Sequence, residues 1–253
     1  MNASMFQSNA PRASESPVLS APHDASTFAK APTGNPSLGA TVQLFARHWS
    51  PRLITASLLI CVPVRLWLGN WTQWDAALAL GLIAFQPVNE WLIHVFVLHL
   101  RPRKIGPWTL DFRLAKKHRA HHLNPWDVDT LFIPVRTLVI SLLVESALFF
   151  TLLPTYALAM SALTTTVAIG LFYEWSHFLP HSAYRPKLKW WRDVVKFHRL
   201  HHFKNENYWM GVSSSFGDML LGTFPNVRDV PNSDTVRTLL SRGDETAERA
   251  NAG

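Results

Sequence analysis

The sequence has a single cysteine, Cys61, among its 253 residues. One cysteine excludes a disulfide framework and a thiolate metal site, because both need several sulfur atoms. The chain also lacks a phosphate-binding loop, a dinucleotide fingerprint, a nucleophile elbow and any repeat of solenoid period. These absences remove the common nucleotide-binding enzymes, the elbow hydrolases and the repeat proteins from consideration.

Charge is sparse as well: charged residues make up 16% of the chain and hydrophobic residues 48%. Residues 1–40 are rich in Ser, Pro, Ala and Asn, and they lack the basic start and apolar core of a secretory signal peptide. We expect a disordered arm over residues 1–45, a membrane domain over 46–228 and a loosely held polar tail over 229–253.

The hydrophobic residues are concentrated in four stretches. About 20 residues of helix cross a hydrocarbon core of roughly 30 Å, and each stretch has about that length. A buried helix of a soluble protein can be equally apolar, but four in one chain favour membrane spans. We expect Arg65 in the first span to extend its side chain to the outer headgroups. The stretches are residues 53–69, 76–98, 137–153 and 155–176.

Positive charge gathers on one side of these spans. Residues 70–75, between the first two spans, contain no Lys or Arg, whereas residues 99–136 and the region after 177 are basic. The positive-inside rule therefore places the basic segments and both termini in the cytoplasm. The net charge of +7 fits contact with anionic lipid headgroups, and no motif for nucleic-acid binding accompanies it.

Ten of the twelve histidines lie in four clusters with the spacing of metal ligands. Neutral imidazole is a common ligand of transition metals, and two six-coordinate ions would leave about two of twelve positions open. Ordinary histidines at a wet surface do not recur four times with this spacing. His23 and His48 stand apart, and we expect both to be solvated. The clusters are His94 and His99; His118, His121 and His122; His177 and His181; and His198, His201 and His202.

Helical geometry gives an expectation for each cluster. Residues three and four apart share a helix face, so each triad should aim at one point, as should the pair His177 and His181. His94 and His99 lie roughly 140° apart on an ideal helix. Either that helix breaks between them, or the two side chains serve different metals.

These blocks resemble the fatty acid hydroxylase superfamily of sterol desaturase-like membrane di-iron enzymes, and most closely the fatty acid 2-hydroxylases. The resemblance covers about residues 50–225. The matching blocks are EWLIHVFVLHLRP at 90–102, HRAHHLNPWD at 118–127, YEWSHFLPH at 173–181, HRLHH at 198–202 and GVSSSFGDMLLGT at 211–223.

The resemblance implies an all-α integral membrane protein, with four transmembrane helices under a helical cytoplasmic cap that holds a histidine-rich dimetal site. It also implies two iron ions, replaceable by zinc in purified protein, and molecular oxygen as cosubstrate. Some relatives carry a fused cytochrome b5, which this sequence does not show. We therefore expect a separate electron donor of the cytochrome b5, ferredoxin or reductase type.

The implied function is oxygen-dependent hydroxylation of the acyl chain of a lipid or fatty acid. The alternatives are a lipid or sterol desaturase with the same dimetal site, and a non-catalytic zinc-binding membrane protein. The substrate stays open among free fatty acids, acyl amides, sphingolipids, sterols and ornithine-type lipids. We expect the bacterial inner membrane as the location, with the endoplasmic reticulum membrane as the alternative.

Metal-bound histidines usually donate their second N–H to a carboxylate, carbonyl or water. The expected acidic partners are Glu90, Asp127, Asp129, Glu174 and Asp218. Five aromatic residues are candidates for the wall of a lipid-tail tunnel: Trp91, Phe96, Trp126, Phe132 and Phe172.

Overall fold

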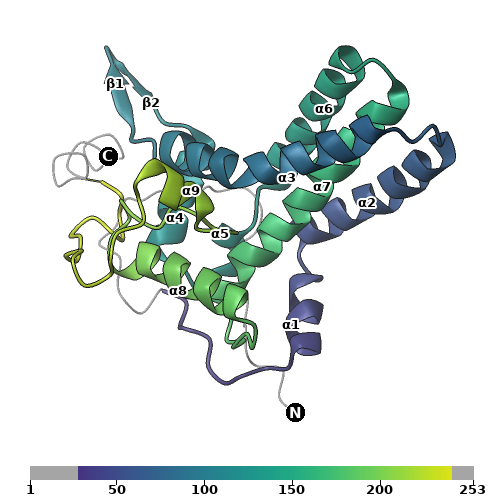
Figure 1. The fold of residues 1–253 in the computed structure, drawn as a ribbon. Coiled ribbons are helices and arrows are strands. Elements are labelled where there is room, and N and C mark those ends of the chain that lie inside the picture. Colours follow the sequence, from purple (N-terminus) through teal and green to yellow (C-terminus); the bar gives the residue numbers. More distant parts are fainter. Residues whose placement is uncertain (1–27, 241–253) are drawn as a thin grey trace.

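The computed structural model describes residues 28–240, and it is mostly helical. Four long helices project together from a cap of shorter helices (Figure 1). They are α2 (Trp49–Leu68), α3 (Gln73–Ile93), α6 (Val135–Leu152) and α7 (Tyr156–Phe178). These bounds confirm the four spans expected from hydropathy. Each helix, with its short extensions, is long and apolar enough to cross a membrane.

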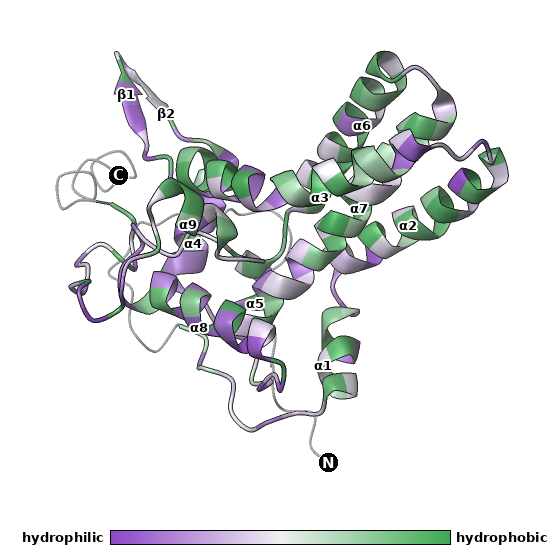
Figure 2. Cartoon of the chain, viewed as in Figure 1, coloured by the Kyte–Doolittle hydropathy of each residue, from purple (hydrophilic) through white to green (hydrophobic). Residues whose placement is uncertain are grey.

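The spans turn their hydrophobic side chains outward, as lipid-facing helices do. Figure 2 shows hydrophobic colour along the four long helices, while hydrophilic colour gathers in the cap on α4 (Arg113–Leu123) and α8 (Lys189–Phe203). Helix α7 packs against α2, α3 and α6 and is the most buried span. Its first half buries Ala159, Ser161 and Ala162, and such small residues let helix backbones approach closely in a membrane.

The cap contains the remaining elements. It holds the short helices α5 (Val128–Leu131), η3 (Leu179–His181) and α9 (Phe216–Leu221) beside α4 and α8. An antiparallel hairpin of β1 (Arg103–Ile105) and β2 (Trp108–Leu110) projects away from it (Figure 1). These strands were not predicted from the sequence.

Both ends of the described chain pack more than expected. Helix α1 (Leu38–Phe45) forms inside the predicted disordered arm, because Ser37 caps its first turn and Phe45 packs against Phe132, Trp175 and Phe178. Residues 1–27, which include His23, lie outside the described residues.

The predicted tail from residue 229 also packs against the cap up to residue 240. Val230, Val236, Leu239 and Leu240 are buried, and the Ser233 N–H donates to the Lys204 carbonyl. These isolated apolar residues form no periodic pattern, so the sequence did not predict this packing. Residues 241–253 are not among those described.

Arg65 does not extend to the headgroups, and this expectation was wrong. The side chain is 3% exposed, and its guanidinium donates to Asp75 at 2.7 Å and to the Gly69 carbonyl at 2.7 Å. Ser161 of α7 donates to the same Asp75 carboxylate at 2.6 Å. The ion pair therefore joins α2, α3 and α7 at the end of the bundle far from the cap.

Replacing Asp75 by Ala should lower the free energy of unfolding by about 3–5 kcal/mol, because it leaves a buried guanidinium without its anion. Thermal denaturation in detergent measures the effect. Lys189→Ala is the control, since that side chain is 80% exposed in its pair with Asp193 and should change stability by less than about 1 kcal/mol. Equal stability of the two variants would contradict a structural role for the ion pair.

Candidate metal centre

The ten clustered histidines converge inside the cap as two groups of five. In each group, one ligand atom from every residue lies within 4.8 Å of the others. All of these side chains are buried except His99, which is half-buried. The first group is His94, His99, His118, His122 and His201, and the second is His121, His177, His181, His198 and His202.

The two triads are split between the groups, and the expectation that each aims at one point was wrong. On α4, His118 and His122 enter the first group and His121 enters the second. On α8 the assignment is reversed, with His201 in the first group and His198 and His202 in the second. At about 100° per residue, positions i and i+4 lie roughly 40° apart, whereas i+3 and i+4 diverge by roughly 100°. The middle histidine of each triad therefore points across to the other group.

His94 and His99 meet because the helix widens between them. Residues His94–Leu98 form a π turn (η2), in which the His99 N–H donates to the His94 carbonyl at 3.0 Å. A π turn pairs residues five apart, so it brings these two side chains onto one face. Their ring centroids lie 4.7 Å apart, and both belong to the first group. Neither a break nor a division between two metals is needed.

The ring nitrogens are spaced as ligands of one ion. Metal–nitrogen bonds of roughly 2.1 Å at right angles would place two nitrogens about 3.0 Å apart. In the first group the Nε2 atoms of His94 and His118 are 3.1 Å apart, and those of His201 and His122 are 3.2 Å apart. In the second group His198 lies 3.1 Å from His181 and 3.0 Å from His202 by the same atoms.

Burial keeps these imidazoles in the form that binds metals. In the cap, burial lowers the pKa of His122 to about 3 and lowers that of His201 well below its usual value, with neighbouring histidines adding to the effect. Neutral rings offer lone pairs to a cation. In the second group, both ring nitrogens of His121 and the Nδ1 atoms of His198 and His202 have no hydrogen-bond partner among the described residues. The donor set therefore fits two transition-metal ions.

Backbone carbonyls orient the first group. The Nδ1 atom of His201 lies 2.9 Å from the Tyr208 carbonyl oxygen, and that of His122 lies 3.0 Å from the Val236 carbonyl oxygen. His94 makes the same contact with the Met210 carbonyl oxygen. A proton on Nδ1 in these contacts leaves Nε2 free to bind a metal.

Glu90 and Asp218 support this arrangement through the loop that follows α8. The Glu90 carboxylate accepts from the N–H groups of Val212 and Ser213 and from the Ser213 hydroxyl. Asp218 accepts from Met210 N–H at 2.7 Å and Gly211 N–H at 2.8 Å. The expected contacts with histidines are thus replaced by contacts with the loop that presents the Met210 carbonyl.

Two glycines in this region allow close approach. A Cβ on Gly211 would lie 2.0 Å from the Ser214 carbonyl oxygen, and one on Gly217 would lie 2.3 Å from the Pro87 carbonyl oxygen. Neither position leaves room for a side chain. The compact turn and the contact of α9 with α3 both depend on these glycines.

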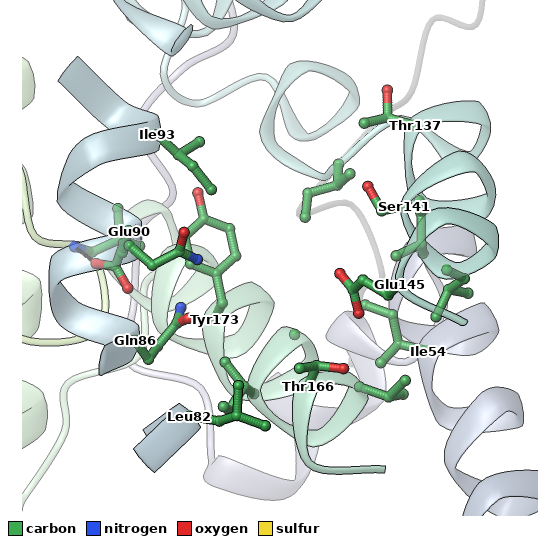
Figure 3. Close-up of a pocket in the computed structure, with 18 of the residues that line it drawn as sticks. Ile54, Leu82, Gln86, Glu90, Ile93, Thr137, Ser141, Glu145, Thr166 and Tyr173 are labelled. Atoms are coloured by element: carbon green, nitrogen blue, oxygen red, sulfur yellow. Dashed lines mark hydrogen bonds between the residues drawn. The ribbon is translucent and has the colours of Figure 1, made fainter. Parts of the chain in front are cut away.

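A cavity of about 350 Å³ leads from the first group into the spans. Residues of α3, α6 and α7 form most of its wall (Figure 3). His94 lines one end. Its lining contains Gln86, Asn89, Glu145 and Tyr173, which the sequence did not single out. Residues scattered over three helices give no local pattern, so only the fold reveals them.

The chain was compared with known protein families. A model of the fatty acid hydroxylase family matches residues 78–223, which is more than half of the chain.

The chain belongs to the fatty acid hydroxylase family.

Relatives of this chain include the dihydroceramide fatty acyl 2-hydroxylase FAH2 of Arabidopsis thaliana. It is 29% identical over 140 residues, covering 55% of this chain and 56% of the relative. The ceramide very long chain fatty acid hydroxylase SCS7 of Saccharomyces cerevisiae is 32% identical over 142 residues, covering 53% of this chain and 34% of the relative. The match thus spans about half or less of these curated relatives.

A solved structure described as full-length Scs7p, with only the hydroxylase domain visible, has the same fold. The TM-score is 0.59 at 25% identity, covering 73% of this chain and 68% of the other. The fatty acid hydroxylase fold therefore extends beyond the sequence blocks that carry the histidines.

The other expected neighbours of the metals lie elsewhere in this hydroxylase-family fold. Asp127 caps α5 by accepting from the Asp129 N–H at 3.0 Å, and within residues 28–240 neither carboxylate hydrogen-bonds to a ligand histidine. Glu174 accepts from the Ile133 N–H at 3.0 Å and from the Ser50 hydroxyl. These carboxylates stabilise the loops and helix ends around the site.

None of the five expected aromatic residues lines the cavity that reaches His94. Trp126 stacks on Phe203, and Trp91 donates to Thr223 at 2.7 Å. Phe96 lines a separate hollow beside His99. Phe132 stacks on His48, which is half-buried rather than solvated and belongs to neither group of five.

Metal analysis tests the crossed assignment. The protein loaded with iron under anaerobic conditions should hold about two ions per chain, and His121→Ala should hold about one, because only the second group loses a ligand. His48→Ala is the matched control and should keep both ions. One ion in the folded parent chain would overturn the two-metal interpretation, and loss of both ions in His121→Ala would overturn the crossed assignment.

Proposed function

We propose that this chain is a membrane di-iron, oxygen-dependent hydroxylase that acts on the acyl chain of a lipid. The observation that carries the proposal is the meeting of two histidine groups with a cavity that descends between apolar spans. A water-soluble substrate would have no reason to enter from this side. A lipid chain already lies at that depth.

The metals are proposed to be iron. Hydroxylation of an unactivated carbon needs a metal that changes oxidation state, and zinc does not. The two ions, held by five histidines each, would supply the activation of molecular oxygen. Zinc can occupy the same nitrogen ligands in purified protein, since imidazole suits both metals. We propose that a cytochrome b5-, ferredoxin- or reductase-type partner provides the electrons.

The described residues position the chain and keep water out. Ile93 and Leu138 line the cavity with apolar side chains. His94 lines the end of the cavity next to the metal centre. The named relatives act on ceramide or dihydroceramide acyl chains. We extend that substrate class to this chain and propose an N-acyl lipid hydroxylated beside its carbonyl carbon.

Lipid mass spectrometry tests the reaction. Cells that express the protein under labelled oxygen should accumulate an acyl lipid with one added labelled oxygen atom. A desaturase would instead yield a product lighter by two hydrogens, and a non-catalytic zinc protein would yield no product. Purified cytochrome b5 and ferredoxin, each with its reductase, are added separately to membranes that contain the protein. One of the two donors should restore turnover.

His201→Ala should abolish the product, because it removes a first-group ligand without touching a span. His23→Ala should leave the yield unchanged, since no ligand group includes it. Both are compared at matched amounts in the membrane, and His202→Ala provides a second-group variant if His201→Ala does not accumulate. Full activity in the ligand variants would refute the metal-centre assignment.

We propose that the cap and both termini face the cytoplasm, in the bacterial inner membrane or, alternatively, the endoplasmic reticulum membrane. The basic residues of 99–136 and of the region after 177 support this orientation. A reporter enzyme fused after Gly253 should be active only if that end is cytoplasmic. A periplasmic or lumenal signal would contradict the orientation.

A further inference from the structure

The end of the cavity farthest from the metals is polar. On α3 the lining ends at Leu82, on α6 at Glu145 and on α7 at Thr166. The Thr166 hydroxyl faces the Glu145 carboxyl and also donates to the Leu163 carbonyl at 3.1 Å. Thr166 precedes His177 by eleven residues of α7, which at about 1.5 Å per residue puts this end roughly 16 Å from the metal ligands.

A polar stripe on α6 leads to this end. Thr137, Ser141 and Glu145 recur every four residues, so they share one helix face, and all three line the cavity. Figure 3 shows them on one wall, with Gln86 and Glu90 of α3 on the opposite wall. A tunnel built only for a plain hydrocarbon chain needs none of these groups.

The two hydroxyls of the stripe differ from other hydroxyls in the spans, because neither has a hydrogen-bond partner among the described residues. Ser146 donates to the Leu142 carbonyl at 2.6 Å, and Thr164 donates to the Met160 carbonyl at 2.6 Å. Among the described residues, the side chains of Thr137, Ser141 and Gln86 make no hydrogen bond. Their polar atoms are therefore available to whatever fills the cavity.

Such groups are costly at this depth. Water does not satisfy polar atoms in the hydrocarbon core, and an ionisable residue there is usually tied to function. Leucine at positions 141 and 145 would close the same wall without placing polar atoms in it. The wall therefore matches a ligand that brings its own hydrogen-bonding group.

We propose that Ser141, Glu145 and Thr166 bind a hydroxyl group on the lipid chain that fills the cavity. This substrate assignment rests on the proposed hydroxylase function. A hydroxyl both donates and accepts, which matches a carboxyl group beside two hydroxyl side chains. At roughly 1.2 Å per bond of an extended chain, 16 Å corresponds to about 13 bonds from the carbon at the metals.

The test is a binding comparison on metal-loaded protein in nanodiscs. Two ceramide-type probes have the same acyl length, and one carries a hydroxyl group about 13 bonds from the carbon beside the carbonyl. Displacement of a fluorescent fatty acid gives each Kd. The parent protein should bind the hydroxyl probe about tenfold more tightly, as one net hydrogen bond predicts.

Variants locate the preference. Glu145→Leu should bind both probes equally, and Ser141→Ala should lose most of the preference. Ser146→Ala is the matched control, because its hydroxyl is on the same helix but bonds to its own backbone and does not line the cavity. It should keep the full tenfold difference. Glu145→Gln retains a hydrogen-bonding side chain and serves as the test if Glu145→Leu does not fold.

Equal binding of both probes by the parent protein would overturn the proposal. So would an equal loss of preference in Ser141→Ala and Ser146→Ala. If Glu145→Leu only admits longer plain chains, the polar end is a length stop and the proposal also fails. Binding is measured without turnover, so a failure of the hydroxylase function itself appears separately, as selective binding without any oxygenated product.

Discussion

Ten imidazoles bring their ring nitrogens to two points inside the cap, and this arrangement fits two cations. The Tyr208 and Val236 carbonyls hold the ring protons of His201 and His122 at Nδ1, so the Nε2 lone pairs of these two rings face each other at 3.2 Å. They repel unless a cation lies between them, because burial in the cap disfavours a second proton on either ring. The π turn, the two histidine helices and the loop after α8 all serve to bring those lone pairs together. The crossing of His121 and His201 then makes each group depend on both helices.

The two groups differ in how firmly their rings are oriented. Three rings of the first group contact backbone carbonyls, and two buried carboxylates fix the loop that carries one of those carbonyls. In the second group, His177 and His181 bond to the backbone of Leu131 and Pro125, whereas the Nδ1 atoms of the other three rings lack partners among residues 28–240. The cavity also opens at the first group, through His94. The group with more of these backbone contacts is thus the one beside the cavity.

The sequence predicted those features that depend on local spacing. Hydropathy located the four spans, and histidine spacing identified all ten members of the two groups. It did not predict the division of each triad, because that depends on how α4 and α8 face each other. The widening between His94 and His99 was missed for a related reason, since an ideal helix was assumed where five-residue pairing occurs.

Other features were missed because their partners are distant or their signals weak. Glu90 bonds to residues more than a hundred positions later, and the cavity wall draws single residues from three helices. Asp75 was within reach of sequence reasoning, since it follows Arg65 by ten residues across a short turn. Weighing the cost of an unpaired guanidinium in the span would have suggested a nearby carboxylate.

The segment over residues 229–240 lies beyond the family match at residue 223, yet it supplies the Val236 carbonyl to His122. Its Arg237 also donates to the Leu123 carbonyl at the end of α4 at 2.8 Å. During synthesis on the ribosome, both hairpins and both histidine helices emerge before residue 236 does. The imidazole of His122 therefore acquires its final orientation only after all of its fellow ligands have been made, so the nascent chain cannot complete its metal centre when the last histidine emerges.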